Sequence, residues 1–317
     1  MRNNFGASII IPTFNRADTI CQSLKTWTTQ SLCNTDFEVI VVDNNSTDNS
    51  AGLIKNFIKD YQNFKYIKEL KKGSTFARHA GAKFAQSDVL IFADDDGLFN
   101  STCIEEILKV YQSNENIVAV AGKIDILWDK IPPEWIKPYE FMLGKLDYGN
   151  EVLIGTDLYL NGGLFSIRKS VFEEFGGFNP DLIGEYLVGD GDTGLVIKLH
   201  KEKRLIGWTP FAQMQHLQLV DKQGTVEDMG RRFFNIGISK SYGLFRANNF
   251  KFKEVVIINI LKSGLILIKK FIEHNFSGRK SRKIFFSLMQ HKGELCFYVH
   301  LRKKEIRRII KKSVYIM

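Results

Sequence analysis

The sequence predicts an α/β fold in which helices cover both faces of a mostly parallel sheet, followed by a basic helical tail. Two patterns carry this prediction. Short β-branched runs alternate with stretches of helical period up to about Ile126, the order expected of a βαβ sheet. Beyond residue 250, amphipathic segments are rich in Lys and Arg, which is typical of helices that meet a polyanionic surface.

Length and composition limit the possible architectures. The 317 residues are 44% hydrophobic and 12% aromatic, enough for one large domain with an appendage or for two modest domains, and disorder throughout is excluded. The N-terminus enters the apolar run Ser8–Ile11 without a cleavable apolar leader, which predicts an unexported protein. The cysteines, Cys21, Cys33, Cys103 and Cys296, show no paired metal spacing, so we expect reduced thiols that serve in packing.

Four apolar runs place the first strands. Each is apolar on both faces, as buried parallel strands are; they are Ile9–Ile11, Val39–Val42, Tyr66–Ile67 and Val89–Phe92. Residues at helical spacing lie between and after these runs and predict three amphipathic helices. Their apolar faces are Ile20, Leu24 and Trp27, then Leu53, Phe57 and Tyr61, and finally Ile104, Ile107, Leu108 and Tyr111.

The pattern then becomes irregular from Trp128 to about Tyr159, where several Pro and Gly residues predict loops laid over the sheet edge. Regular elements return after this stretch. They are a strand at Leu164–Ile167, a short helix at Lys169–Phe175 stopped by Gly176 and Gly177, a helix at Asp192–Leu199 and a strand at Leu205–Trp208. We expect this first domain to close near Phe245.

Charge separates the tail from the rest of the chain. Residues 251–317 hold 17 Lys and Arg against 4 Asp and Glu, while the remainder holds 27 against 31, within a net charge of +9. A basic tail on a mildly acidic body indicates a polyanionic surface, either anionic lipid or nucleic acid.

Two basic amphipathic helices are predicted in this tail. In Val255–Glu273 the polar residues fall on one narrow face, and Lys262 interrupts the apolar run, so the helix is expected to lie in a membrane interface and not to cross it. The second, about Leu295–Lys312, places apolar residues on one side and basic residues opposite. The plain alternative is that both helices dock onto the first domain.

Polar residues follow the predicted strands at the points where ligands bind in open parallel sheets. The segment Pro12–Arg16 follows the first strand and Asp43–Asp48 follows the second. Backbone groups near Thr13 can hold the edge of a base, and a carboxylate after the second strand can accept a hydrogen bond from a base N–H. Such loops are also frequent turns and helix caps, and Asn45–Asp48 has that alternative for the helix beginning near Ser50.

The triple acid Asp94-Asp95-Asp96 follows the buried run Val89–Phe92 directly. Like charges packed together at a sheet terminus are costly without a cation. Mn²⁺ or Mg²⁺ fits, because these hard cations are held by one or two carboxylates together with substrate phosphates. The metal would neutralise a diphosphate leaving group.

Six segments in order resemble the inverting glycosyltransferases of family 2, which have the GT-A fold, a Rossmann-like sheet. They are IIIPTFNR, VIVVDNNSTD, ARHAGAKFAQSDVLIFADDD, GGLFSIRKSVFEEFGGFNPDL, GDGDTGLVIKL and WTPFAQMQH. The resemblance covers about residues 7–245 and implies a nucleotide-sugar-binding half at 1–126 and an acceptor-side half at 127–245, leaving 246–317 as the tail. Each segment alone is a weak motif, and their order makes the resemblance specific.

The resemblance implies roles for individual residues. Asp43 matches the acid that contacts the base, Asp94 lies where the ribose binds, and Arg78 lies in the segment that lines the phosphates. The full donor-binding set is Pro12, Thr13, Asn15, Arg16, Asp43, Asn45, Arg78, Asp94 and Asp95. The metal set is Asp96 of the DxD motif with Asp94 and His216, although a lone His is usually structural and His216 could equally contact phosphate.

The catalytic base of the family lies in a Glu-Asp pair that opens a helix. Alignment through Thr193 places Asp192 at this position, with Asp190 as the fallback, and a carboxylate there could remove the proton of the attacking hydroxyl. An acid at a helix N-terminus is also explained by the helix dipole. Two departures from the family pattern are Gly191, in place of the usual acid, and His79, where Asn is usual after Arg78.

These observations predict transfer of a sugar with inversion from a nucleotide-diphosphate donor to a surface-glycan or lipid-linked acceptor. UDP-sugar is favoured over GDP- or dTDP-sugar. The protein is expected in the cytoplasm, on the inner face of the membrane and bound to its anionic surface by the tail. A sugar-1-phosphate nucleotidyltransferase would need a Gly-rich basic loop after the first strand, which Pro12–Arg16 is not. A non-catalytic basic-tailed binding protein is the other alternative; the retained acids Asp43, Asp94, Asp96 and Asp192 argue against it, and we expect no nucleic-acid partner.

Overall fold

The structure is a computed structural model that describes residues 6–183, 187–247, 252–276 and 281–312. The chain divides into two compact units. The first, here called the sheet unit, comprises residues 1–129, 137–178 and 195–218. The second, the helical unit, comprises residues 130–136, 179–194 and 219–317.

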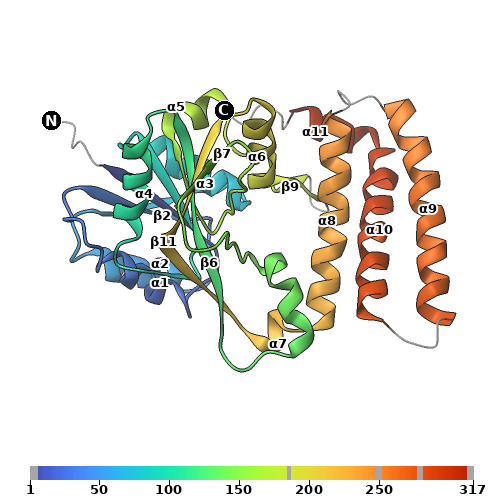
Figure 1. The fold of residues 1–317 in the computed structure, drawn as a ribbon, viewed down its shortest axis with the longest axis horizontal. Coiled ribbons are helices and arrows are strands. Elements are labelled where there is room, and N and C mark those ends of the chain that lie inside the picture. Colours follow the sequence, from blue (N-terminus) through green and yellow to red (C-terminus); the bar gives the residue numbers. More distant parts are fainter. Residues whose placement is uncertain (1–5, 184–186, 248–251, 277–280, 313–317) are drawn as a thin grey trace. The chain divides into compact units, whose positions relative to one another are not determined.

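A nine-stranded sheet organises the sheet unit (Figure 1). Its strands are β1 (Ala7–Thr13), β2 (Phe37–Asp43), β3 (Phe64–Lys68), β4 (Val89–Ala93), β5 (Gly97–Phe99), β6 (Ile117–Trp128), β7 (Leu153–Gly155), β8 (Leu164–Arg168) and β11 (Leu205–Gln218). They lie in the order β3-β2-β1-β4-β8-β6-β11-β5, and β7 pairs with β11. Strands β1 to β4 are parallel, β6 and β11 also pair in parallel, and β8 runs antiparallel between β4 and β6.

The predicted mostly parallel α/β sheet is confirmed, with corrections at its edges. Strand β3 is an edge strand whose side chains are mostly half-buried, so the expectation that Tyr66–Ile67 is buried on both faces is wrong. Strands β5 and β7 were not predicted because three residues are too few to show a period. The long strand β6 was also missed, since its second half carries Gly122, Lys123 and Asp125 among the apolar residues.

Helices cover both faces of this sheet. They are α1 (Ile20–Trp27), α2 (Ser50–Ile58), α3 (Ser74–Phe84), α4 (Cys103–Ser113), α5 (Lys169–Glu174) and α6 (Gly191–Lys201), with a 3₁₀ helix η1 at Glu134–Leu143. Alternate strand residues serve two cores. Ile9 and Ile11 pack with α1, α2 and α4, whereas Ile10 packs with α3, α5 and α6. Helix α2 ends before Tyr61, whose ring instead stacks on Phe57 from outside the helix.

The helical unit has its own core. Its elements are the hairpin strands β9 (Leu182–Ile183) and β10 (Leu187–Val188) and the helices α7 (Val220–Gln223), α8 (Val226–Ala247), α9 (Phe252–Phe276), α10 (Arg282–Leu301) and α11 (Lys304–Lys312). Helix α10 lies between α8 and α9 (Figure 1). A Cβ on Gly293 would lie 1.9 Å from the carbonyl oxygen of Phe234, so glycine permits the close approach of α10 to α8.

The second helix of the tail differs from its prediction in two ways. The predicted helix Leu295–Lys312 is broken after Leu301, where Arg307 donates to the carbonyl oxygens of Leu301 and Arg302. Its apolar residues do not share one side, because Val299 is 48% exposed while Ile306 and Ile310 are buried in the helical core. Helix α8, which reaches across the predicted boundary at 245, packs on α10, and both helices belong to the helical unit.

A buried acid links the first three strands at the end of the sheet where they begin. Glu38 is fully buried, and its carboxylate accepts hydrogen bonds from the Ser8 hydroxyl at 2.7 Å and from the Gln86 amide at 2.6 Å. Its other oxygen lies 2.8 Å from Nζ of Lys65. Because a buried charge needs such partners, the network fixes the register of β1, β2 and β3.

Replacing Glu38 with Ala should lower the free energy of unfolding by about 3 kcal/mol, because it leaves several buried donors without an acceptor. Urea unfolding measures this as a lower midpoint at unchanged slope. The matched variant Glu105→Ala removes an acid from the exposed face of α4 and should change the midpoint little. Equal midpoints for the two variants would contradict the role given to Glu38.

Candidate active site

The carboxyl ends of β1, β2 and β4 gather the polar segments that the sequence singled out. The loops after β1 and β2 are tied together, since the Asn15 side chain accepts from the Thr47 amide at 2.8 Å and donates to the Thr47 hydroxyl at 3.2 Å. The backbone N–H of Arg16 donates to the Ser50 hydroxyl at 2.8 Å. Both loops are therefore shaped by contacts with each other.

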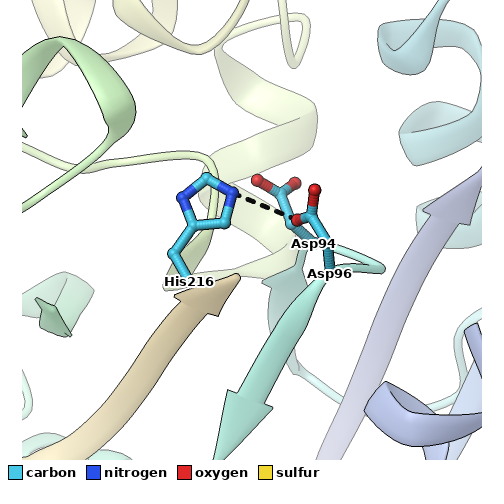
Figure 2. A group of neighbouring side chains, drawn as sticks. All are labelled: Asp94, Asp96 and His216. Carbon is cyan, nitrogen blue, oxygen red and sulfur yellow. Dashed lines mark ion pairs between the residues drawn. The ribbon is translucent and has the colours of Figure 1, made fainter. Parts of the chain in front are cut away.

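Three metal-ligand side chains meet at the end of β4. Asp94 and Asp96 follow that strand and His216 lies near the end of β11, and Figure 2 shows all three pointing toward one another. One ligand atom from each lies within 4.8 Å of the others. The register that pairs His216 with Gly97 of β5 explains this meeting, because β5 begins immediately after Asp96. The structure thus brings together the predicted metal set.

The ring of His216 is oriented from both sides. Nε2 lies 3.1 Å from Oδ1 of Asp96, and the backbone of Leu143 forms a further hydrogen bond with the ring. Burial lowers the pKa of this imidazole. The hydrogen bond and charge of Asp96, together with the charge of Asp94, outweigh this effect, so the pKa is raised overall. A backbone contact on one nitrogen leaves the other for a metal, as in many histidine metal sites.

Arg78 sits beside Asp94 on the inner face of α3. Its guanidinium is nearly buried and donates to Oδ1 of Asp94 at 2.8 Å and to the Gly162 carbonyl at 3.1 Å. A Cβ on Gly81, one turn later, would lie 2.4 Å from Ile10, so glycine lets α3 approach the sheet closely. This approach holds Arg78 at the strand ends.

Arg16 joins the other two acids of the triple. Its Nε lies 3.3 Å from Asp95 and its Nη2 lies 3.0 Å from Asp96. Burial raises the pKa of Asp95 to about 7, against the opposing effect of Arg16. Asp95, predicted in the donor-binding set, therefore shares Arg16 with Asp96 but does not belong to the group of ligand atoms formed by Asp94, Asp96 and His216.

Asp43 is fully buried at the end of β2, with both oxygens engaged. Oδ1 accepts from the Ser46 amide at 2.8 Å and Oδ2 accepts from the Tyr66 hydroxyl at 2.7 Å. Burial raises the pKa of Tyr66 to about 12, with further contributions from the hydrogen bond and charge of Asp43. Tyr66 is a residue of the site that the sequence pattern alone does not indicate. The one feature that could have identified Tyr66 is its hydroxyl in the predicted third strand.

The remaining residues of the predicted donor set lie in β1 and in the two loops. Pro12 and Thr13 are the last two residues of β1, and both are buried. Asn15 and Asn45 have φ values of 52° and 63°, the left-handed region that Asn tolerates better than most residues. Asp48 accepts the amide of Ser50 at 2.9 Å, so the alternative of a turn before α2 applies to this acid.

Asp190 and Asp192 belong to the helical unit. Asp190 pairs with Arg246 of α8 at 3.2 Å and is 5% exposed. Asp192 is the second residue of α6, and one of its oxygens accepts the amide of Thr193 at 2.8 Å. Gly191 between them has a φ of 38°, which accounts physically for Gly where the family pattern has an acid.

The second departure, His79, has a local structural role. Its Nε2 accepts the Phe178 amide at 3.1 Å, and its ring lies 5.3 Å from that of Phe172. Burial lowers its pKa, partly offset by the backbone hydrogen bond with Phe178. The neutral ring therefore holds the chain that leaves α5 against α3.

The donor set can hold a divalent cation and an anion side by side. Two carboxylates and one imidazole suit Mn²⁺, whereas an all-oxygen set would suit Mg²⁺ equally well. Arg16 and Arg78 supply guanidinium groups at the same acids, and such groups bind phosphate oxygens in pairs. The arrangement fits a metal-bound diphosphate.

The family profile described as Glycosyl transferase family 2 matches residues 8–176. The chain is 31% identical over 122 residues to the poly(ribitol-phosphate) beta-N-acetylglucosaminyltransferase TarP of Staphylococcus aureus, which covers 38% of this chain and 36% of TarP. It is 28% identical over 200 residues to the GalNAc(5)-diNAcBac-PP-undecaprenol beta-1,3-glucosyltransferase of Campylobacter jejuni, covering 62% of this chain and 60% of that protein. The chain thus spans less than two thirds of either relative.

Among solved structures, GalNAc-T7 with UDP, GalNAc and Mn²⁺ has a TM-score of 0.54 to this chain at 17% identity. The superposition covers 68% of this chain and 43% of that one. At this identity the likeness concerns the fold, and it supports the predicted GT-A class.

Proposed function

The chain belongs to glycosyl transferase family 2, and from this premise we propose that it transfers a sugar with inversion from a nucleotide-diphosphate donor to a lipid-linked or polymeric glycan acceptor. The observation that carries the proposal is the convergence of Asp94, Asp96 and His216 at the carboxyl end of the sheet. Family membership alone would leave the chemistry of this chain open, because site residues can be lost within a fold.

The donor is proposed to bind across the ends of β1, β2 and β4. Asp43 would use its remaining acceptor capacity for the base, and Asp94, Asp96 and His216 would hold Mn²⁺, which offsets the charge of the diphosphate as it leaves. Arg78 and Arg16 would donate to phosphate oxygens. A UDP-sugar is the favoured donor, and the Mn²⁺ of the GalNAc-T7 structure, which also holds UDP, supports this choice by analogy.

Asp192 is proposed as the general base. Inversion requires one displacement, in which the acceptor hydroxyl attacks the face opposite the diphosphate and loses a proton to a carboxylate. The acids at the end of β4 are committed to the donor side. Asp190 is paired with Arg246 and only 5% exposed, whereas Asp192 is half-buried. The greater exposure of Asp192 favours it over Asp190, because an attacking hydroxyl must reach the base.

The acceptor class follows from the names of the relatives. One acts on poly(ribitol phosphate) and the other on an undecaprenol-diphosphate glycan. Both are surface-glycan acceptors or precursors, and the second is anchored in a membrane. The nucleotidyltransferase alternative is disfavoured because the loop after β1 is tied to Thr47 and lacks the glycines that would cradle a triphosphate.

We propose that α9 binds to the surface of a membrane. Five apolar residues line one side of this helix at alternating spacings of three and four, and each is 50% to 70% exposed: Ile258, Leu261, Leu265, Ile268 and Ile272. We call this set the α9 stripe. Lys262 and Lys269 are exposed along one edge of it, while Ser263, predicted on the polar face, is buried on the opposite side. The expected single polar face is therefore replaced by an exposed apolar one.

Charge selects the occupant of the α9 stripe. A seven-residue repeat of apolar positions also suits a coiled coil, but in a parallel self-pair Lys262 and Lys269 would occupy flanking positions that face the uncharged residues Ile257 and Gly264. An anionic lipid surface complements both lysines and receives the apolar side chains. No helix in the described part of the chain reaches the length and hydropathy needed to cross a bilayer. The exposed α9 stripe and its two lysines lead us to propose a peripheral position at the cytoplasmic face of a membrane.

Donor binding should depend on Mn²⁺ held through Asp96. In a thermal-shift panel of UDP-, GDP- and dTDP-sugars, the true donor at about 100 times its dissociation constant should add about 2.7 kcal/mol of stability in Mn²⁺. Chelator or Asp96→Asn should abolish the shift, because the diphosphate then meets uncompensated carboxylates. The exposed variant Asp60→Ala is the control. A full shift in chelator would show that the metal assignment is wrong.

Loss of the general base should lower turnover without weakening donor binding. Asp192→Asn should lower transfer by roughly 100-fold or more while leaving donor affinity within a few-fold, since Asn keeps the shape but cannot accept the proton. Transfer can be measured as nucleotide release with a polyprenyl-diphosphate glycan or poly(ribitol phosphate) as acceptor. An active Asp192→Asn with a dead Asp190→Asn of wild-type stability would move the role to Asp190; two active variants would exclude the one-base mechanism.

The double variant Lys262→Gln, Lys269→Gln should bind anionic vesicles about 30-fold more weakly than the wild type, since each lysine near the surface contributes about 1 kcal/mol. Cosedimentation at low salt measures this, and added salt should weaken the wild type. The charge-matched control Lys25→Gln, Lys59→Gln lies in the sheet unit and should bind normally. Equal binding of the wild type to neutral and anionic vesicles would contradict the proposed binding of α9 to a membrane. So would a wild-type dimer that is lost in Leu265→Ser.

A further inference from the structure

Helix α8 forms hydrogen bonds and an ion pair with the loop that carries the two candidate bases. The Ser239 hydroxyl donates to the Gly189 carbonyl at 2.8 Å. Two turns later, Nη1 of Arg246 lies 3.4 Å and 3.2 Å from the two oxygens of Asp190. The spacing of seven places Ser239 and Arg246 on one side of α8, so a single helical face holds two successive residues of the loop.

The Arg246–Asp190 pair is largely withdrawn from water. The side chains are 19% and 5% exposed, and the guanidinium lies 5.5 Å from the ring centroid of Tyr242, which is fully buried. A carboxylate buried to this degree is costly unless a cation compensates it. Loss of Arg246 would therefore remove the cation that compensates Asp190 at 3.2 Å and weaken its hold on this position.

Displacement of Asp190 would reach Asp192 through the backbone. The Asp190 carbonyl accepts the Gly194 amide at 2.9 Å and so starts α6, while the Gly189 amide donates to Asp181 at 2.7 Å. A Cβ on Gly189 would lie 1.7 Å from the Pro180 carbonyl oxygen, so the loop is packed tightly at its start. Asp192 has little freedom while Asp190 is held.

We propose that Arg246 is a positioning residue that fixes the Asp190–Asp192 loop for catalysis, and that Asp190 is its anchor. The inference rests on the proposed role of Asp192 and assigns a second task to the C-terminal helices. Tyr242 and Phe245, which precede Arg246 on α8, pack in one core with Ile306 and Ile310 of α11. Helix α11 thereby supports the geometry of the base, whatever its contact with a membrane.

Hydrogen exchange and kinetics together test this role. Arg246→Met should speed amide exchange across residues 189–194 by about tenfold or more, because the local opening free energy falls. Exchange in β1, β4 and α10 should be unchanged. Turnover should fall by roughly 100-fold, the cost of a misplaced catalytic group, while the dissociation constant for UDP with Mn²⁺ stays within about twofold of wild type.

Three further variants make the test specific. Arg246→Lys, which keeps the charge but not the planar guanidinium, should be intermediate. The double variant Arg246→Met, Asp190→Asn should be no worse than Arg246→Met alone, because the two residues act as one unit. Ile236→Ala, at an exposed position of α8, should match wild type.

The outcomes separate this inference from the proposed base. Unchanged exchange in Arg246→Met, exchange raised equally throughout α8 and α10, full turnover despite a loosened loop, or an additive double variant would each overturn it. If Asp192→Asn is active while Arg246→Met loosens the loop and lowers turnover, the base assignment fails and the positioning role stands with another catalytic group.

Discussion

Mutual repulsion among the acids at the end of β4 is the constraint on which the active-site architecture depends. Asp94, Asp95 and Asp96 follow a strand whose residues are all buried, so the fold must supply positive charge at that point. It does so with the guanidinium groups of Arg16 after β1 and Arg78 on α3, and the ring of His216 on β11 lies beside Asp96 as well. Each of these groups comes from a different part of the chain, and the sheet order is what brings them together.

The proposed function uses the same groups. Asp94, Asp96 and His216 would hold a divalent cation, and Arg16 and Arg78 would donate to phosphate oxygens, because this binding needs concentrated and well-oriented charge. The acids of the triple also differ in their contacts. The ligand atoms of Asp94 and Asp96 converge with that of His216, while Asp95 lies beside Arg16 and has a pKa raised to about 7 by burial.

In the helical unit, the buried helix faces and the exposed face of α9 have different proposed roles. The inner sides of α8, α10 and α11 form a core that supports the loop of Asp190. The outer side of α9 presents the α9 stripe. The basic excess of the tail indicated a surface partner, but docking, which was the plain alternative, describes α11, whose Ile306 and Ile310 are buried.

The sequence by itself determined the strands β1 to β4 and the acids that follow them, because apolar runs and turn residues are local signals. It also indicated Asp192 and His216, although only through a family pattern. The tertiary structure decided what no local signal contains. The pairing of β11 with β5 brings His216 to Asp96 across more than a hundred residues. Similarly, the burial of Asp190 against Arg246, and of Ile306 beside Tyr242, depends on which helix faces pack together, and a hydrophobic period states that a face is buried but not against what.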